Sequence, residues 1–209
     1  MKKRYIILLA AIAILALGIA FPFLRAAHQM KEYLQIVDPH FAPHVKLFAT
    51  YNPVDGAFNM RITDDSEASI FLECASDGLI IDEMRTNRYL EEHSIPTRFT
   101  ADDESVGVLY CYWKYDSPNE PLFILSVGRG NGFPVTDEAQ LEEALKARML
   151  THYDQLSDIV TDRLLRCHIH HQTDSASYRI TVNTTATDDF ASLLDQAEVT
   201  KEKLDRHTN

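Results

Sequence analysis

The sequence predicts an α+β protein, in which an N-terminal transmembrane helix precedes one domain with a mainly antiparallel sheet. Two observations lead to this prediction. Residues 5–24 form an uninterrupted apolar run, and beyond residue 44 apolar residues recur at every second position and later at every third or fourth. Strand pairs with the pattern of hairpins are followed by a helical segment at least twice, and helices packed on one face of the sheet are the economical arrangement for that order.

The N-terminal apolar run is long enough to cross a membrane. No charged or strongly polar side chain occurs in it, and about 20 helical residues at about 1.5 Å each span a hydrocarbon core. A cleavable signal peptide would have its small-x-small site at Gly18-Ile19-Ala20. Because apolarity continues past that site to Leu24, we favour an uncleaved signal anchor over a cleaved signal peptide.

Charges on the two flanks predict the orientation of this anchor. Three basic residues, 2–4, precede the run, whereas Arg25 and Lys31 after it are soon joined by Glu32 and Asp38. The positive-inside tendency keeps the N-terminus in the cytoplasm and places the rest outside, in a single-pass protein of the cell membrane. We therefore expect four parts in chain order: a cytoplasmic tip (1–4), a transmembrane anchor (5–24), a juxtamembrane helix with a proline-containing linker (25–43) and an extracytoplasmic α+β domain (44–209).

Composition limits the partners of the exported part. The 17 basic residues that follow the anchor face 31 acidic ones, a net charge of −14 over about 185 residues. An acidic surface repels phosphates, so we expect no nucleic-acid partner. The expected partners are the membrane, through the N-terminal helix, and a protein or a component of the cell envelope.

The three cysteines Cys74, Cys111 and Cys167 each lie in a strand-like run. Their number is odd and too small for a scaffold built on disulfides. A buried free cysteine behaves as a small hydrophobe, which favours three core thiols over one disulfide and one free thiol. The sequence does not choose among the three possible pairs.

The first half of the exported part is predicted to be a short stalk followed by strands. Residues 25–37 have helical periodicity and are expected to continue the anchor outward until the prolines at 39 and 43 end the helix. Residues 45–51 and 58–62 alternate around the turn 52–56, which is typical of a half-exposed hairpin.

A third strand is predicted over 70–74, after the acidic loop 63–67. Residues 79–92 fit either a returning strand or a helix. We favour a short strand and then a helical turn, because Thr86 and Asn87 are better caps than interior helix residues.

The second half contains the strongest strand pair and two helices. Residues 105–115 and 122–127 are apolar on both faces, which predicts strands in the middle of a sheet. A helix is expected from about residue 137 to residue 160. A last hairpin, 164–171 with 178–184, precedes a final helix that begins at Thr187 or Asp188 and extends to Leu204.

His168 and His170 form the most suggestive cluster for chemistry. On a strand they project from one face, and such a pair ligates zinc or copper when further ligands converge. Arg166 and Arg179 are predicted on the same face, where they would repel a cation. We therefore expect the two histidines to face water and the alternate residues of both strands, Ile169 and Ile180 among them, to face the core.

The second candidate is the loop Gly128–Gly132, whose three alternate glycines lie between a strand and a helix. Phosphate-binding loops occupy that position, but neither the dinucleotide fingerprint nor the Walker pattern is complete. Turn geometry explains the glycines better than anion binding by Arg129 does.

The known nucleophile motifs, Gly-x-Ser-x-Gly and Ser-x-x-Lys, do not occur. We therefore assign no catalytic, cofactor-binding or metal-binding residue, and no cofactor. The expected function is a membrane-anchored extracytoplasmic module with a non-enzymatic binding or envelope-associated role. Two alternatives stay open: a metal-dependent hydrolase that uses His168 and His170, and a small-ligand sensor that uses the Gly128–Gly132 loop.

Overall fold

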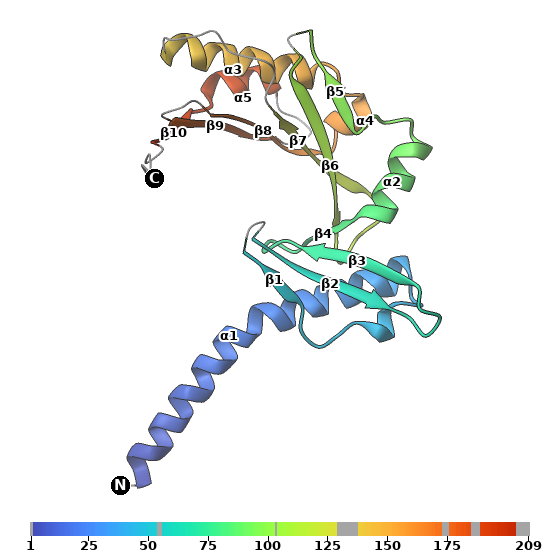
Figure 1. Cartoon of the computed structure of the whole chain (residues 1–209), viewed down its shortest axis with the longest axis vertical. Coiled ribbons are helices and arrows are strands. Elements are labelled where there is room, and N and C mark those ends of the chain that lie inside the picture. The colour runs from blue at the N-terminus through green and yellow to red at the C-terminus, as the bar shows by residue number, and fades with distance from the viewer. Residues whose placement is uncertain are drawn as a thin grey trace, which may run out of the picture. The chain divides into compact units, whose positions relative to one another are not determined.

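The predicted α+β class is confirmed by the computed structural model of the chain (Figure 1). The structure describes residues 2–53, 56–102, 104–128, 138–172, 176–184 and 189–203, with side chains from residue 14 in the first helix and from residue 140 in the third. Its strands form a ten-stranded, mostly antiparallel mixed sheet in the hydrogen-bonded order β1-β2-β3-β4-β6-β7-β8-β9-β10, with β5 also paired to β6.

The chain divides into two compact units. Unit 1 consists of Met1–Asn87 and Tyr112–Glu120, and unit 2 of Arg88–Cys111 and Pro121–Asn209. The strand β6 (Val106–Lys114) contributes residues to both. The elements of unit 1 are α1 (Lys2–Val37), the 3-10 helix η1 (Ala42–His44), β1 (Thr50–Asn52), β2 (Ala57–Thr63), β3 (Ser69–Cys74), β4 (Leu79–Asp82) and the first half of α2 (Glu83–Glu92).

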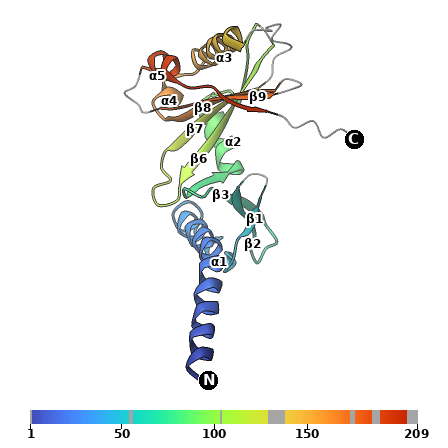
Figure 2. The same cartoon turned by 90° about the vertical axis from the view of Figure 1, so that its left-hand side faces the viewer.

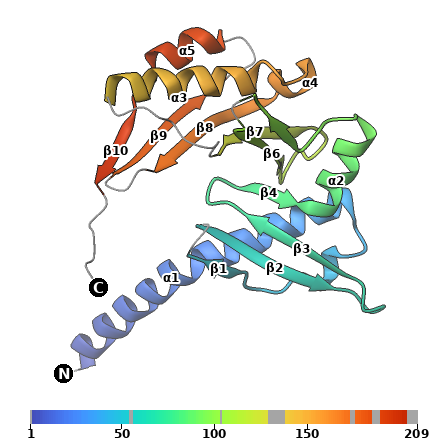
Figure 3. The ribbon, with the colours of Figure 1, turned by 45° about the horizontal axis from the view of Figure 1, so that its top comes forward.

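The second half of α1 belongs to the core of unit 1 and is not a stalk. Side chains at a spacing of three and four residues are buried on one stripe of the helix: Ala26, Ala27, Met30, Tyr33 and Leu34. This stripe covers the face of β2 and β3 that carries Met60, Ile62 and Leu72, which are also buried (Figure 3). The sheet needs such a cover because one of its faces is apolar, and the periodic stripe of 25–37 supplies it.

The first half of α1 extends beyond the strands of unit 1 (Figure 2). The predicted anchor, 5–24, includes residues 5–13, whose side chains lie outside the described ones. Within the residues that the structure describes, no helix combines the length and the apolar composition that are needed to cross a membrane.

Two predictions near the start of the sheet are corrected in detail. Strand β1 begins at Thr50 and not at residue 45, because the ladder with β2 starts there. In the segment before it, the Lys46 N–H donates to the Met60 sulfur at 3.3 Å. For residues 79–92 the preferred order, a short strand and then a helical segment, is confirmed, but this segment is a helix of 10 residues and not a single turn. Thr86 and Asn87, which were expected as caps, lie in the interior of α2. The helix is capped before them by Asp82, whose carboxylate accepts the Arg85 N–H at 3.0 Å.

Unit 2 places helices over a sheet whose central pair is parallel. It contains most of β6, together with β5 (Arg98–Thr100), β7 (Pro121–Val127), α3 (Glu138–Tyr153), α4 (Asp158–Thr161), β8 (Leu164–Gln172), β9 (Ala176–Asn183), α5 (Phe190–Gln196) and β10 (Thr200–Lys203). Strands β7 and β8 are parallel, and α3 in the connection between them packs on both. Helix α5 packs on α3, where the Tyr153 and Phe190 rings stack with centroids 3.9 Å apart (Figure 3).

Three predicted elements of unit 2 differ from the structure. The helix expected over 137–160 is divided into α3 and α4. The end of the expected final helix is the strand β10, which pairs with β9, and Leu204 lies outside the described residues. The expected caps Thr187 and Asp188 also lie outside them, and Asp189 caps α5 by accepting the Ala191 N–H at 3.2 Å.

Candidate functional site

The last hairpin has the faces that the sequence predicts. Cys167 and Ile169 on β8 and Ile180 and Val182 on β9 are buried, and cross-strand pairs join them in register. Arg179 faces His170 directly across the ladder. On this opposite face Arg166 and His170 are exposed, and His168 is half-buried.

The polar face of β8 and β9 is held by short local contacts. The Arg166 Nε–H donates to the Asn183 side-chain oxygen at 3.0 Å, and His170 Nε2 lies 2.7 Å from the Ser177 hydroxyl. Burial lowers the pKa of His168, and the neighbouring Arg166, Arg179 and His170 lower it further. Among the described residues, no group of three or more His, Cys, Asp or Glu side chains has the geometry to hold a metal ion. The arginines make this face suited to an anion.

The glycine-rich loop falls largely on residues that are not described, since only Gly128 of Gly128–Gly132 lies within the described residues. Its N–H donates to the Val106 carbonyl at 2.8 Å, which joins the end of β7 to β6. Turn geometry, which the sequence favours for this loop, and anion binding by Arg129 both concern residues outside the described ones, and the described part of the loop is held by this backbone contact.

All three cysteines are buried free thiols, as the sequence analysis favoured. Burial raises the pKa of Cys74 to about 12 and also raises that of Cys167. The Cys74 thiol donates to the Gln29 side-chain oxygen at 3.4 Å, from the sheet to α1. Protonated, buried thiols are unreactive, so Cys74 and Cys167 are core residues and not nucleophiles.

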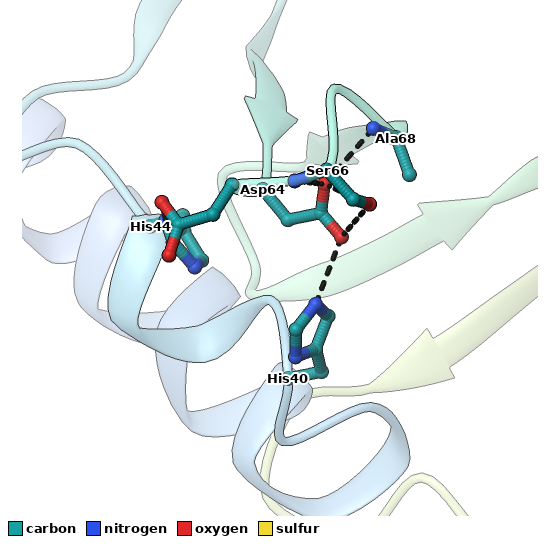
Figure 4. Close-up of polar contacts among 6 residues, drawn as sticks. His40, His44, Asp64, Ser66 and Ala68 are labelled. Carbon is teal, nitrogen blue, oxygen red and sulfur yellow. Dashed lines mark hydrogen bonds and ion pairs between the residues drawn. The ribbon is translucent and has the colours of Figure 1, made fainter.

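A polar cluster in the acidic loop 63–67 surrounds Asp64 (Figure 4). One carboxylate oxygen accepts the N–H groups of Ser66 and Ala68, each at 2.9 Å, and the Ser66 hydroxyl at 2.8 Å. The other oxygen accepts the His40 Nε2–H at 2.8 Å. The cluster joins the chain just after α1 to the loop between β2 and β3.

The geometry around Asp64 is that of an anchored turn. In a nucleophilic triad the histidine would lie between the serine and the carboxylate, whereas here Ser66 and His40 both contact Asp64. Desolvation alone would raise the pKa of Asp64, but the hydrogen bonds from Ser66, His40 and Ala68 outweigh it and hold the pKa below its usual value. The cluster therefore stabilises a loop and has no nucleophile.

Unit 2 contains a Ser–His contact that the sequence did not indicate. Ser105 Oγ and His152 Nε2 are 2.8 Å apart, although 47 positions separate them in the chain. The distance suits a nucleophile and its base, but both residues are 0 % exposed. The pair is a polar contact within the core where α3 meets β6, made possible by Gly107, because a Cβ there would lie 2.9 Å from the His152 ring.

A run of exposed apolar side chains lies on α1. Five side chains between residues 14 and 21 are each more than 60 % exposed: Ile14, Leu15, Leu17, Ile19 and Phe21. Monomeric soluble proteins rarely expose contiguous apolar side chains, and such patches mark contacts with lipid or with another protein.

The described geometry thus contains an apolar helix, a cationic sheet face and two polar clusters with structural roles. Known proteins add nothing to this picture: the chain matches no protein-family model, no curated protein and no solved structure.

Proposed function

We propose that this chain is a single-pass membrane protein whose N-terminal helix anchors an extracytoplasmic α+β region, and that this region binds an anionic partner without catalysing a reaction. The observation that carries the proposal is the contrast within α1. The helix is continuous from Lys2 to Val37, its large apolar side chains between Ile14 and Phe21 are exposed, and a stripe between Ala26 and Leu34 is buried on a sheet.

The apolar sequence from residue 5 to residue 24 supports the anchor. It has the length of a membrane-crossing helix, and inside lipid a helix satisfies its own backbone hydrogen bonds. Three basic residues before it, followed by a strongly acidic remainder, support an N-terminus in the cytoplasm and units 1 and 2 outside.

The polar face of β8 and β9 supports the binding role. Arg166 and Arg179, with His168 and His170 between them, place positive charge on a chain whose net charge is −11. Charge complementarity steers association and selects partners. An acidic peptide or an anionic envelope polymer fits this face, whereas a metal ion bound by the two histidines would be repelled by both arginines.

The anchor is tested by charging the exposed half of α1. Ile14→Arg combined with Leu17→Arg should release the full chain from membranes, because a central arginine costs about 2.5–3.5 kcal/mol in insertion experiments. Ile36→Arg is the matched control, since Ile36 is exposed on the same helix beyond the predicted anchor. Flotation of vesicles with the bound chain measures the effect, and flotation of the double variant like the parent would overturn the anchor.

The orientation is tested by a reporter fused after Asn209. An enzyme that is active only outside the cytoplasm should work there, and one that is active only in the cytoplasm should not. The reverse pattern would overturn the extracytoplasmic location.

The binding face is tested with polyglutamate as an anionic probe for the detergent-solubilised full chain. Arg166→Ala with Arg179→Ala should weaken retention at least tenfold, whereas the charge-matched control Arg61→Ala with Arg98→Ala should not, since those arginines lie on β2 and β5. Equal loss from both pairs would show a diffuse electrostatic effect. Stoichiometric zinc or copper that is lost when His168 and His170 become alanine would replace this proposal with the metal-dependent hydrolase.

A further inference from the structure

We infer that unit 1 lies on the membrane surface. The contact is made by Leu47, Phe48 and Tyr51, which we call the interfacial patch, and this patch lies in the lipid headgroup region. The inference rests on the proposed anchor and deepens it, because it adds a second lipid contact in the folded region. These three side chains are 71 %, 50 % and 45 % exposed.

The depth of the patch follows from the path of β2 along α1. Phe58, Met60 and Ile62 share the face of β2 that α1 covers, and the Phe23 ring meets the Phe58 ring edge-on with centroids 5.3 Å apart. At the other end, His40 just beyond α1 contacts Asp64 just beyond β2. Residues 23–37 of a helix and 58–64 of a strand both cover about 20 Å, so β2 runs alongside α1 in the same direction.

The segment that carries the patch runs back toward the anchor. The Lys46 N–H contacts the Met60 sulfur, Thr50 pairs with Asn59, and Tyr51 pairs with Phe58. Along the direction of β2, residues 46–51 therefore run from beside Met60 to beside Phe58. Phe58 in turn contacts Phe23 on α1. The Tyr51 and Phe58 rings are 5.1 Å apart, so an aromatic row connects the patch to the helix.

The position of this row matches the boundary of a membrane. The apolar run ends at Leu24 and the first charge after it is Arg25, so Phe23 and the rings beside it lie where headgroups meet water. Aromatic side chains are enriched at that depth. Arg25 and Lys46, both exposed, suit lipid phosphates.

Charge at the opposite end of unit 1 agrees with this orientation. The acidic loop with Asp64, Asp65 and Glu67 follows the distal end of β2, and it begins about 20 Å from Phe58 at strand spacing. Anionic lipids repel carboxylates, and this loop is the part of unit 1 that lies farthest along β2 from the anchor. The acidic loop thus lies at the end of β2 away from the patch, while Asp77, three residues after Cys74, which pairs with Phe58, is a carboxylate at the patch end.

The test places a tryptophan in the patch of the full chain, reconstituted in vesicles of phosphatidylcholine and phosphatidylglycerol with brominated acyl chains. Bromine quenches nearby indoles, and Trp113, buried and shared by all variants, gives a constant background. Phe48→Trp and, separately, Tyr51→Trp should be quenched at least twofold more than Phe71→Trp. Phe71 is the control because it is 42 % exposed, pairs with Arg61 and lies on the sheet face away from α1.

Two outcomes separate the inference from the proposed anchor. If the chain floats with vesicles while Phe48→Trp and Tyr51→Trp are quenched no more than Phe71→Trp, the patch does not touch lipid and the anchor stands. If the chain does not float, the anchor itself fails. Using two reporter positions keeps the result interpretable when one variant folds poorly.

Discussion

Helices α1 and α3 each pack on a sheet, and the comparison between them separates two meanings of apolar sequence. The second half of α1 and the part of α3 whose side chains are described each bury one mainly apolar stripe, with a fully buried methionine in each, Met30 and Met149. Between residues 14 and 21, the side chains of α1 are apolar on all sides of the helix and the large ones are exposed. An apolar stripe therefore indicates a helix that covers a sheet, whereas apolarity on all sides is the pattern that the proposed membrane anchor requires.

The two helices also differ in their buried polar contacts. On α1, the Tyr33 hydroxyl donates to Asp82 at 2.9 Å, and burial and this carboxylate raise the pKa of Tyr33. On α3, His152 contacts Ser105 in a site without water access. Both contacts attach a helix to its sheet at one defined position, because a buried polar group without its partner costs about 1–3 kcal/mol.

The largest effect is expected from removing α1. A chain that begins at Asp38 loses Met30, Tyr33 and Leu34, whose burial contributes about 5–9 kcal/mol at about 1.5–3 kcal/mol each, a large part of a typical domain stability. Unit 1 should then fail to fold, seen as lost near-ultraviolet dichroism and as aggregation in size-exclusion chromatography. A chain that begins at Arg25 keeps all three and should fold. A monodisperse, cooperatively unfolding chain from Asp38 would restore the stalk interpretation.

The next largest loss of stability is expected from matched substitutions in the two cores that α1 and α3 form with their sheets. Met30→Ala and Met149→Ala should each lower the free energy of unfolding by about 2–5 kcal/mol, through lost burial and the cavity left behind. Urea unfolding of the solubilised chain measures both. A small loss at Met30 with a large loss at Met149 would show that α1 packs less tightly than α3.

A smaller effect is expected where α3 meets β6. Gly107→Ala places a Cβ 2.9 Å from the His152 ring and 3.3 Å from Leu125, and overpacking of this kind costs about 1–3 kcal/mol. Gly18→Ala is the control on α1, since nothing lies within 4 Å of a Cβ there, and it should leave the unfolding transition unchanged or slightly raised. An unchanged Gly107→Ala variant would mean that the ring moves freely in its site.

The Asp64 cluster should make the stability of unit 1 depend on acid. The folded state holds the pKa of Asp64 below its ordinary value, so the stabilisation is present above the unfolded value of about 4 and is lost as pH falls through the lower folded value. Asp64→Asn should remove this contribution, and its difference from the parent should shrink as the pH of a thermal melt falls below about 4. A difference that does not change with pH would show that hydrogen bonding alone, and not charge, stabilises the loop.

The smallest effect is expected on the polar face of the last hairpin. His168→Ala with His170→Ala should change stability by no more than about 0.5 kcal/mol, with or without a chelator, whereas the control Ile169→Ala should cost about 2–5 kcal/mol. Denaturant melts measure both. A loss of several kcal/mol from the histidine pair that chelation reproduces would reveal a structural metal.

The alternation of apolar and polar residues predicted those features of the fold that depend on a single pair of adjacent strands. The faces of β8 and β9 follow from alternation, since Ile169 and Ile180 must share a side in any register that buries either. The buried free thiols follow from their apolar neighbours. The polar face of the candidate site was predictable for the same reason. The arginines beside His168 and His170 lie on the same two strands, so the alternation within these strands is enough to place them on one face.

The rest was beyond local pattern because it depends on segments far apart in sequence. The short polar strand β10 forms only because it pairs with β9. The sequence of residues 200–203 by itself is equally compatible with the end of a helix. The Ser105–His152 contact joins residues that are 47 positions apart in the chain, and the His40–Asp64 contact joins residues that are 24 positions apart. Neither pair lies within the span over which periodicity carries information.

The sequence by itself determined the apolar run of residues 5–24, the α+β class and the phase of the last hairpin, because these depend on composition and on side chains at most four positions apart. Only the tertiary structure decided that residues 26–34 cover a sheet and that β7 and β8 run parallel. The physical reason is that an apolar stripe is stabilised by whichever surface removes it from water. The stripe specifies that it must be buried, and the fold of the whole chain selects the partner.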